Sequence, residues 1–215
     1  MEVRCSQLPN RFGDGPKTHP SIPGFININV CSSSRQWSRQ MSPMIEMEFL
    51  ADNEEWKYFE NWWQAGKIYS FQSDEDWEKK REEMRIDNKP HRRSYPKKMG
   101  SAISSSYHGR IYDYLSSRIK IYCTNYVYLY EDSTTYKKLF DLHQKEKINI
   151  IGFDGRDIPI TERSLRKAVC DPGFIFGHEL VICSMLIGYH PWEDQLVTNR
   201  IHKTEEEGKL VYTFK

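Results

Sequence analysis

The segment from Asp52 to Tyr69, DNEEWKYFENWWQAGKIY, constrains the fold of this chain more than any other, because it predicts an amphipathic helix. Asp52 followed by Glu55 has the spacing of a capping box, and carboxylates in a first turn suit the helix dipole. At 100° per residue, one arc of this helix carries three aromatic side chains, Trp56, Phe59 and Trp63. We expect this arc to pack on a hydrophobic core.

A polar stripe adjoins the aromatic arc. Glu60, Gln64 and Lys67 follow at positions i, i+4 and i+7, a spacing that places them on one side of a helix. Burial without partners costs about 1–3 kcal/mol for each polar group, so these side chains need partners or a ligand. The alternative is that all three reach water at the edge of the core, as ionisable side chains usually do.

Patterning along the rest of the chain predicts an α+β, helix-dominated fold with a small sheet component. Residues 1–24 hold several Pro and Gly and predict an irregular N-terminal arm, which precedes a single domain over residues 25–215. Strands are expected over residues 25–31, in 148–157 before a Gly-containing turn, and at the edge over 210–214. Helices are expected over residues 76–85, 109–120, 124–130, 136–145, 164–168 and 176–189. For the Tyr-rich part of 111–130, a strand is the alternative to a helix.

The net charge and the spacing of the cysteines indicate which partners and which cellular compartment suit the chain. The formal net charge is +1, so no overall attraction to nucleic acid or membrane follows. Five cysteines are scattered without a C-x-x-C pair, which argues against a zinc site or disulfide framework and favours a reducing compartment. The start lacks an apolar signal segment, and the longest apolar-rich run, Leu180–Tyr189, is short for a membrane span. We expect a soluble, cytoplasmic protein.

The run Glu60-Asn61-Trp62-Trp63-Gln64-Ala65-Gly66-Lys67 resembles the signature of the NADAR family, the YbiA-like N-glycosidases. In that family a helix carries Glu, two mostly aromatic positions after one spacer, then Gln-Ala, one residue and Lys. The order and spacing of Glu60, Gln64, Ala65 and Lys67 match this pattern. The chain resembles a divergent member of this family, of a kind associated with viral and phage genomes. The resemblance implies the NADAR fold and, for a viral protein, the host cytoplasm.

The NADAR resemblance also implies hydrolysis of the bond between ribose, or ADP-ribose, and a nucleobase or related heterocycle, without a metal or other cofactor. Such a reaction passes through an oxocarbenium-like sugar, which a carboxylate stabilises while water attacks. Glu60 is the candidate carboxylate, Gln64 the positioning group, and Lys67 a second catalytic group that converges on the ligand. Trp63, with Trp56, is the candidate wall on which a base stacks.

Two loops are candidates for substrate binding. Ser42, in Ser-Pro-Met, resembles the segment before the family's signature helix, and backbone amides there could meet a phosphate; a simple turn is the alternative. Arg92 and Arg93 lie in a basic loop that resembles the family's basic stretch after the signature helix. The functional interpretation is that these arginines bind phosphate, and the alternative is a loop whose charges are only solvated.

Two later positions are further candidates. Asp154 follows a predicted strand as a candidate catalytic carboxylate, or forms a turn before Gly155. His178 and Glu179 open the last buried helix. We expect Glu179 to cap the helix. For His178 two roles stay open, which are capping and substrate binding in a pocket.

Two other classes of function stay open. One is a non-catalytic module that binds a nucleotide or modified nucleic acid, and the other is a transferase that modifies DNA bases on the same site. The joint presence of Glu60 and Lys67 favours catalysis, because a binding module does not need both. The expected partners are a nucleotide, ADP-ribose or an ADP-ribosylated base, with DNA left open and no membrane.

Overall fold

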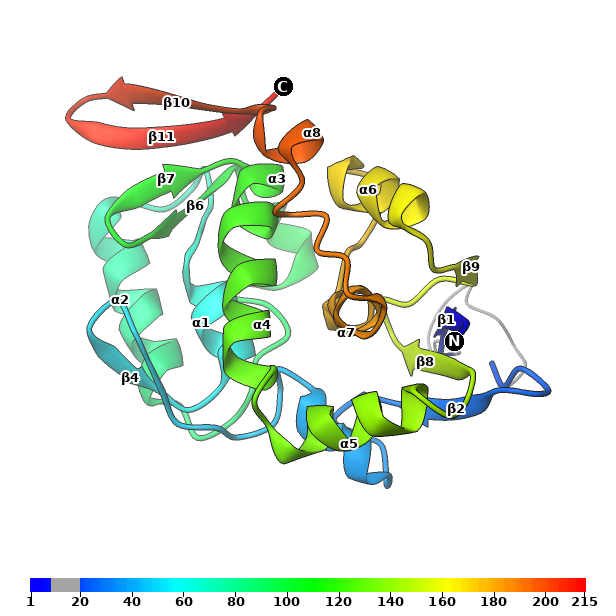
Figure 1. The fold of residues 1–215 in the computed structure, drawn as a ribbon. Helices are drawn as coiled ribbons and strands as arrows, with labels where there is room; N and C mark the ends of the chain where they lie inside the picture. Colours follow the sequence, from blue (N-terminus) through cyan, green and yellow to red (C-terminus); the bar gives the residue numbers. More distant parts are fainter. Residues whose placement is uncertain (9–19) are drawn as a thin grey trace. The chain divides into compact units, whose positions relative to one another are not determined.

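A computed structural model describes residues 1–8 and 20–215 (Figure 1). The α+β class predicted from the sequence is confirmed. By their internal contacts, the described residues form two compact units: residues 1–42 with 123–198, and residues 43–122 with 199–215. Each unit has a sheet and helices of its own. The domain boundary at residue 24 and the single domain that follows it stay predictions.

The first unit is built on a four-stranded sheet with the order β2-β8-β1-β9. Its strands are β1 (Val3–Gln7), β2 (Ile26–Asn29), β8 (Ile148–Gly152) and β9 (Ile158–Pro159). β1 and β2 run parallel to β8 on either side of it, and β9 is antiparallel to β1. Every residue of β8 is buried, as expected for a central strand of a parallel sheet. The strands predicted in 25–31 and 148–157 are confirmed.

Strand β1 corrects the prediction that residues 1–24 are irregular. Val3 and Cys5 are buried, and Cys5 lies opposite Ile150 of β8 in the sheet. The strand was missed because its five residues are short and partly polar, and its pairing partner lies far along the chain. The part of the predicted arm over residues 9–19 lies outside the described residues.

The helices of the first unit are 3-10 helix η1 (Trp37–Met41) and α-helices α4 (Thr124–Tyr130), α5 (Thr134–His143), α6 (Glu162–Cys170), α7 (His178–Ile187) and α8 (Gln195–Thr198). Helix α7 packs against β1 and β8 and is buried along nearly its whole length, which explains its uniformly apolar sequence (Figure 1). It ends at Gly188, whose φ of 66° gives the left-handed cap that glycine favours. The helices predicted over residues 124–130, 136–145, 164–168 and 176–189 are confirmed.

The second unit contains a five-stranded sheet with the order β10-β11-β7-β6-β5 and a separate two-stranded hairpin, β3-β4. The strands are β3 (Phe49–Ala51), β4 (Glu54–Trp56), β5 (Lys67–Ile68), β6 (Ser104–Tyr107), β7 (Arg110–Tyr112), β10 (Ile201–Glu206) and β11 (Lys209–Phe214). Its helices include α1 (Phe59–Ala65), α2 (Asp74–Ile86) and α3 (Tyr114–Ser117). The sheet component is therefore larger than the sequence predicted, whereas the helix predicted over 76–85 is confirmed.

Helix α1 is shorter than the predicted helix from Asp52 to Tyr69. The predicted capping box is wrong, because Asp52 and Asn53 form the turn of the β3-β4 hairpin with φ values of 56° and 63°. A two-residue hairpin turn of this kind requires positive φ at both positions, which Asp and Asn tolerate better than most residues. Trp56 therefore lies on β4, so it does not belong to the aromatic arc of the helix, which keeps Phe59 and Trp63.

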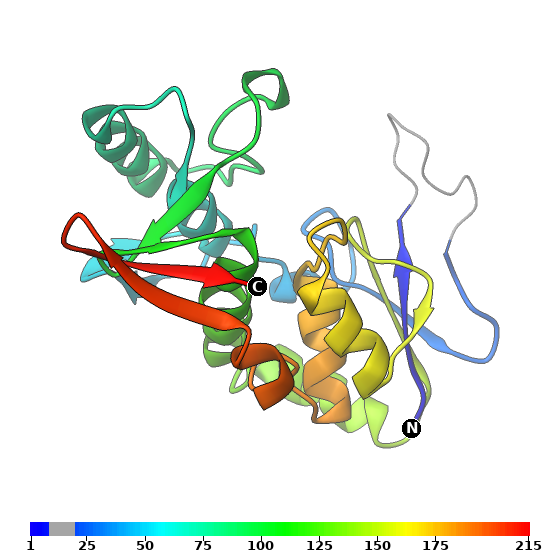
Figure 2. The ribbon, with the colours of Figure 1, turned by 90° about the horizontal axis from the view of Figure 1, so that it is seen from above.

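Two predictions near the five-stranded sheet are also corrected. The helix predicted over 109–120 begins as strand β7 and becomes helical only at α3, which continues into a π-helical segment, Arg118–Cys123. Residues 210–214 are not an edge strand, because β11 pairs with β10 on one side and β7 on the other (Figures 1 and 2). The outer strand β10 carries exposed charged residues, which discourage further pairing at an edge.

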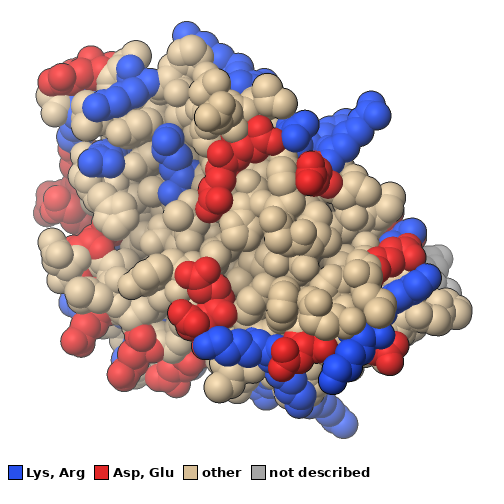
Figure 3. All heavy atoms as spheres, viewed as in Figure 1, with Lys and Arg blue, Asp and Glu red and all other residues tan. Residues whose placement is uncertain are grey.

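Within the residues that the structure describes, no helix combines the length and apolar character needed to cross a membrane. On the face drawn in Figure 3, Lys and Arg side chains are interspersed with Asp and Glu. This mixture agrees with the net charge of +1. Any attraction of a charged ligand must therefore come from local groups.

We expect alkaline pH to destabilise the first unit through Tyr136 of α5, whose hydroxyl donates to the Met185 carbonyl at 3.1 Å. Burial, reinforced by Glu131, raises the pKa of Tyr136 from 10.0 to about 12. The folded state then retains a proton that the unfolded state has lost, so the free energy of unfolding falls as pH rises from 10.0 to about 12. Tyr136→Phe should flatten this decline, measured by urea unfolding across that range.

The matched control for this experiment is Tyr128→Phe, because Tyr128 of α4 is 76% exposed. We expect this variant to keep the wild-type dependence on pH. If Tyr136→Phe shows the same slope as the wild type, the linkage through Tyr136 is wrong.

Candidate functional site

Three polar side chains predicted to act together form one hydrogen-bonded array at the end of α1. Gln64 donates from Nε2 to Glu60 Oε1 at 2.7 Å, and its Oε1 accepts from Lys67 Nζ at 2.8 Å. Gln64 is buried, whereas Glu60 and Lys67 are partly exposed on either side of it. Because one amide bridges a carboxylate and an ammonium, its orientation is fixed by the charges of its two neighbours.

The end of α1 is held by close packing against β6. Gly66 closes the helix, and Lys67 begins β5 opposite Ser105 of β6. A Cβ at Gly66 would lie 2.2 and 2.3 Å from two ring carbons of Tyr107 and 2.7 Å from its hydroxyl oxygen, so only glycine allows this approach. Lys67 thus lies beyond the helix, in a position that depends on the turn at Gly66 as well as on helical spacing.

Tyr107 of β6 packs against the end of α1, the helix that carries Glu60 and Gln64. Its ring stacks on Trp63 with centroids 5.6 Å apart and planes 4° apart, and its hydroxyl donates to the Trp63 carbonyl at 2.6 Å. Burial raises the pKa of Tyr107 well above its usual value, and the carboxylates of Asp52 and Glu60 raise it further, against a hydrogen bond with Ser105 that lowers it. Tyr107 therefore remains a protonated donor across the range of physiological pH.

The predicted aromatic wall is only partly present. Trp63 is 8% exposed, with one face covered by Tyr107, a tilted contact with Tyr122 at 5.0 Å, and Lys67 Nζ at 5.4 Å from its ring centroid. A base cannot stack on the face that Tyr107 covers. Trp56 is buried on β4, where the Arg81 guanidinium lies 5.3 Å from its ring centroid. The expectation that Trp56 shares a helix face with Trp63 is therefore wrong.

The basic loop that contains Arg92 and Arg93 is tied to α1. Asn61 of α1 donates to the Met84 and Lys89 carbonyls at 3.0 Å and accepts the His91 N–H at 2.7 Å. Ser94 donates from its hydroxyl to the carbonyl of Gln64. Both arginines are exposed between these anchors, so the loop lies beside the helix that carries the polar array. Phosphate binding by this loop stays a prediction.

Ser42, Asp154 and His178 lie in the first unit, whereas the array and the basic loop lie in the second. The N–H of Ser42 donates to the Arg39 carbonyl at 3.0 Å, and its carbonyl accepts from the Tyr130 hydroxyl at 3.2 Å. Because the Ser42 amide is engaged in this turn, the structure favours the plainer alternative for Ser42.

Asp154 and His178 meet around a completely buried carboxyl group, Glu179. Glu179 Oε1 accepts the N–H of Asp154 at 3.3 Å, so the expected capping of α7 by this side chain is wrong. Asp154 itself is exposed, just after β8. The carboxyl ends of parallel strands are a common location for ligands, which keeps a functional role for Asp154 open.

The ring of His178 lies against the buried carboxyl group of Glu179. His178 Nε2 lies 3.3 Å from the Val30 carbonyl, which can only accept, so this nitrogen carries hydrogen. Its Nδ1 then faces Glu179 Oε2 at 3.4 Å, and that oxygen makes no other hydrogen bond although it is buried.

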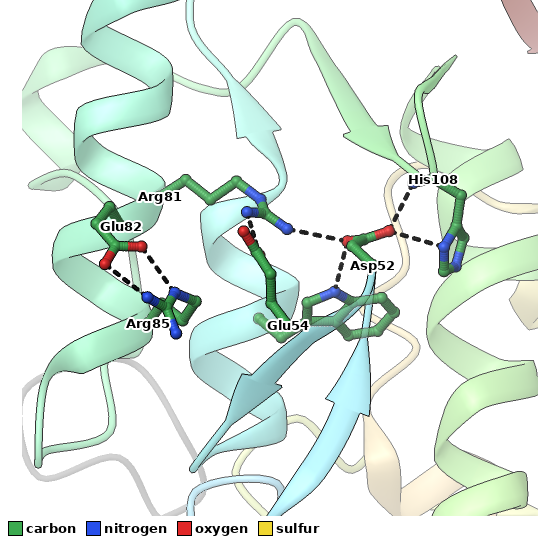
Figure 4. A network of polar contacts seen from close by, with 7 residues as sticks. Asp52, Glu54, Arg81, Glu82, Arg85 and His108 are labelled. Atoms are coloured by element: carbon green, nitrogen blue, oxygen red, sulfur yellow. Dashed lines mark hydrogen bonds and ion pairs between the residues drawn. The ribbon is translucent and has the colours of Figure 1, made fainter.

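A second polar network, which the sequence analysis did not predict, is centred on Asp52 (Figure 4). Asp52 Oδ1 accepts the backbone N–H of His108 at 2.8 Å and contacts His108 Nδ1 at 2.7 Å. Asp52 Oδ2 accepts from Trp62 Nε1 at 3.1 Å and from Arg81 Nη2 at 3.2 Å. The dipeptides Asp52-Asn53 and His108-Gly109 are turn signals, but nothing local predicts that the two turns meet.

Over residues 1–8 and 20–215, no group of three or more His, Cys, Asp or Glu side chains is arranged to hold a metal ion. Comparison with protein-family models finds no match, and neither curated proteins nor solved structures give a significant match.

We expect Gly152→Ala to destabilise the first unit strongly. The added Cβ would lie 1.8 Å from Glu179 Oε1 and 2.0 Å from its Cγ, and the Glu179 side chain is completely buried. Overpacking of this kind costs about 3 kcal/mol in the free energy of unfolding, which urea denaturation measures. Combining Gly152→Ala with Glu179→Ala should cost less than the sum of the two single changes.

Gly173→Ala provides the control, because its Cβ would meet only Asp171 Oδ1, at 3.3 Å. This variant should lose much less stability than Gly152→Ala. Strict additivity in the double variant would contradict the close contact between residues 152 and 179.

Proposed function

We propose that this chain is an N-glycosidase that hydrolyses the bond between ribose, or ADP-ribose, and a nucleobase or related heterocycle. The observation that supports this most is the array in which Gln64 bridges Glu60 and Lys67. It gathers a carboxylate, a rigid amide and an ammonium within one short stretch. These are the groups that the resemblance to NADAR N-glycosidases requires at these positions.

Glu60 is the catalytic carboxylate in this proposal. The C1′–N bond breaks as positive charge develops on the sugar, and the nearby carboxylate stabilises that charge. Water then forms the new C1′–O bond and passes one proton to Glu60, and the departing nitrogen takes up this proton through solvent, which restores the carboxylate. Gln64 holds Glu60 through one oxygen, which fixes the carboxylate relative to the helix.

Lys67 and the basic loop supply the positive charge for the phosphates of the substrate. Lys67 is partly exposed and is held by Gln64 on the same array as Glu60. Arg92 and Arg93 are exposed on a loop anchored to α1 through Asn61 and Gln64. Guanidinium groups bind phosphate in a bidentate manner and with more specificity than a single ammonium.

We expect Glu60→Gln to reduce turnover by about 10²–10⁴-fold while ADP-ribose still binds, because the amide cannot act as a base or balance a cation. Turnover is measured by mass spectrometry of the base released from ribosylated nucleobases and from ADP-ribosylated DNA. Glu55→Gln is the matched control, since Glu55 is exposed on β4 of the same unit.

Equal base release by the wild type and Glu60→Gln would remove Glu60 from catalysis. Binding of ADP-ribose without release of a base from any of these substrates would instead favour a non-catalytic nucleotide-binding module. Transfer of the sugar to DNA in place of water would favour a transferase.

We expect Lys67→Ala to weaken ADP-ribose binding by about tenfold or more, the size of a charge-assisted hydrogen bond, while binding of an unphosphorylated nucleoside changes little. Titration calorimetry of both ligands measures the two affinities. Lys203→Ala is the control, because Lys203 is exposed on β10 of the same unit. Equal loss for both ligands would assign Lys67 a structural role through Gln64.

A further inference from the structure

A pocket of about 670 Å³ opens in the second unit between two hairpin tips and helix α2. The β3-β4 tip contributes Asp52, the β6-β7 tip contributes His108, and α2 contributes Trp77 and Arg81. Its volume lies in the range of sites for small organic ligands. The pocket uses neither Glu60 nor Lys67, so it is separate from the proposed glycosidase array.

Asp52 fixes both the position and the tautomer of His108. Its Oδ1 contacts the backbone N–H and ring Nδ1 of the same histidine, at 2.8 and 2.7 Å, so Nδ1 carries hydrogen. In the neutral ring the other nitrogen, Nε2, is then an acceptor. The His108 side chain is 45% exposed in the pocket wall, so this acceptor is presented on an ordered side chain.

The backbone at the two tips favours small or polar turn residues. Asp52 and His108 have φ values of 56° and 52°, in the left-handed region that costs about 1 kcal/mol or more for residues other than glycine. The hairpin turns require this geometry, and glycine would adopt it more readily. The side chains at these positions make the Asp52–His108 contact, which glycine could not provide.

The one lysine or arginine that lines the pocket is already paired with carboxylates. Arg81 is its only lysine or arginine among the lining residues, and the guanidinium pairs with both Asp52 and Glu54 (Figure 4). The same guanidinium lies 5.3 Å from the Trp56 ring centroid and 5.9 Å from that of Trp77. Glu54 lies outside the lining, and together with Asp52 it outweighs the one guanidinium, so the charge beside the pocket favours a cationic or neutral donor.

We propose that this pocket binds a small, flat nitrogen base, of the amidine or protonated aminoheterocycle class, that donates an N–H to His108 Nε2. Trp77 and the half-exposed imidazole provide the aromatic surface beside it, and the negative balance of Asp52, Glu54 and Arg81 favours its positive charge. The site is distinct in chemistry from the proposed glycosidase array, where Lys67 suits phosphate.

Benzamidine is the probe for this site, and benzoate has nearly the same shape with the opposite charge. Two-dimensional NMR of the histidine Cε1–Hε1 groups follows the His108 signal during each titration of the intact chain. We expect benzamidine to shift this signal saturably, with a Kd of about 1 mM for a ligand of fragment size, and benzoate to leave it in place.

His108→Gly removes the acceptor and keeps a backbone that is favourable at positive φ. It should weaken benzamidine about tenfold, measured at the Trp77 indole signal. Asn53→Gly is the matched control, because Asn53 lines the same pocket in the same backbone region and should bind like the wild type. Absence of saturation, an equal response to benzoate, or wild-type affinity in His108→Gly would overturn the proposal.

Discussion

The packing of Tyr107 against the end of α1 is the constraint on which the second unit depends. Its ring stacks on Trp63 and occupies the space that only a glycine at position 66 leaves open. Its hydroxyl bonds the Trp63 carbonyl at the same time, so one side chain fixes both the distance and the rotation of the helix end. The next residue, His108, begins the turn that meets Asp52. The end of β6 therefore positions the polar array and the pocket together.

Local sequence signals were sufficient where an element is stabilised by its own residues or by uniform burial. Helix α2 has a capping box between Ser73 and Asp76, and α7 is apolar on all sides and stopped by Gly188. The error at residues 52–56 has a different cause. The helical periodicity of the aromatic residues includes Asp52-Asn53, although that dipeptide is also a hairpin turn signal and its positive φ values exclude a helix. Pairing with β3 decided between the two patterns.

The candidate site was predictable in its spacing but only partly in its geometry. Glu60 and Gln64 are four residues apart on α1, and the expected contact between them is present. Lys67 reaches Gln64 from β5, so the contact depends on how tightly the chain turns at Gly66, which helical spacing does not describe. The Asp52–His108 contact joins residues 56 apart in sequence, and the burial of Glu179 depends on three separate segments. Contacts of this kind follow from tertiary packing.

The Glu60–Gln64–Lys67 array and the network around Asp52 differ in whether their positive charges are already paired with carboxylates. This difference determines which ligands each of them suits. At the end of α1, one carboxylate and one ammonium are bridged by a neutral amide, and a basic loop is anchored alongside. Positive charge therefore exceeds negative charge among these groups, which agrees with the phosphate-bearing substrate that we propose. Around Asp52, two carboxylates enclose the single guanidinium, which also lies against two indole rings. Desolvation makes each of these charges costly to leave unpaired, so Arg81 is held by its protein partners and is not released to an anion. The acceptor that remains is the imidazole of His108, and an acceptor beside a net negative charge suits a donor.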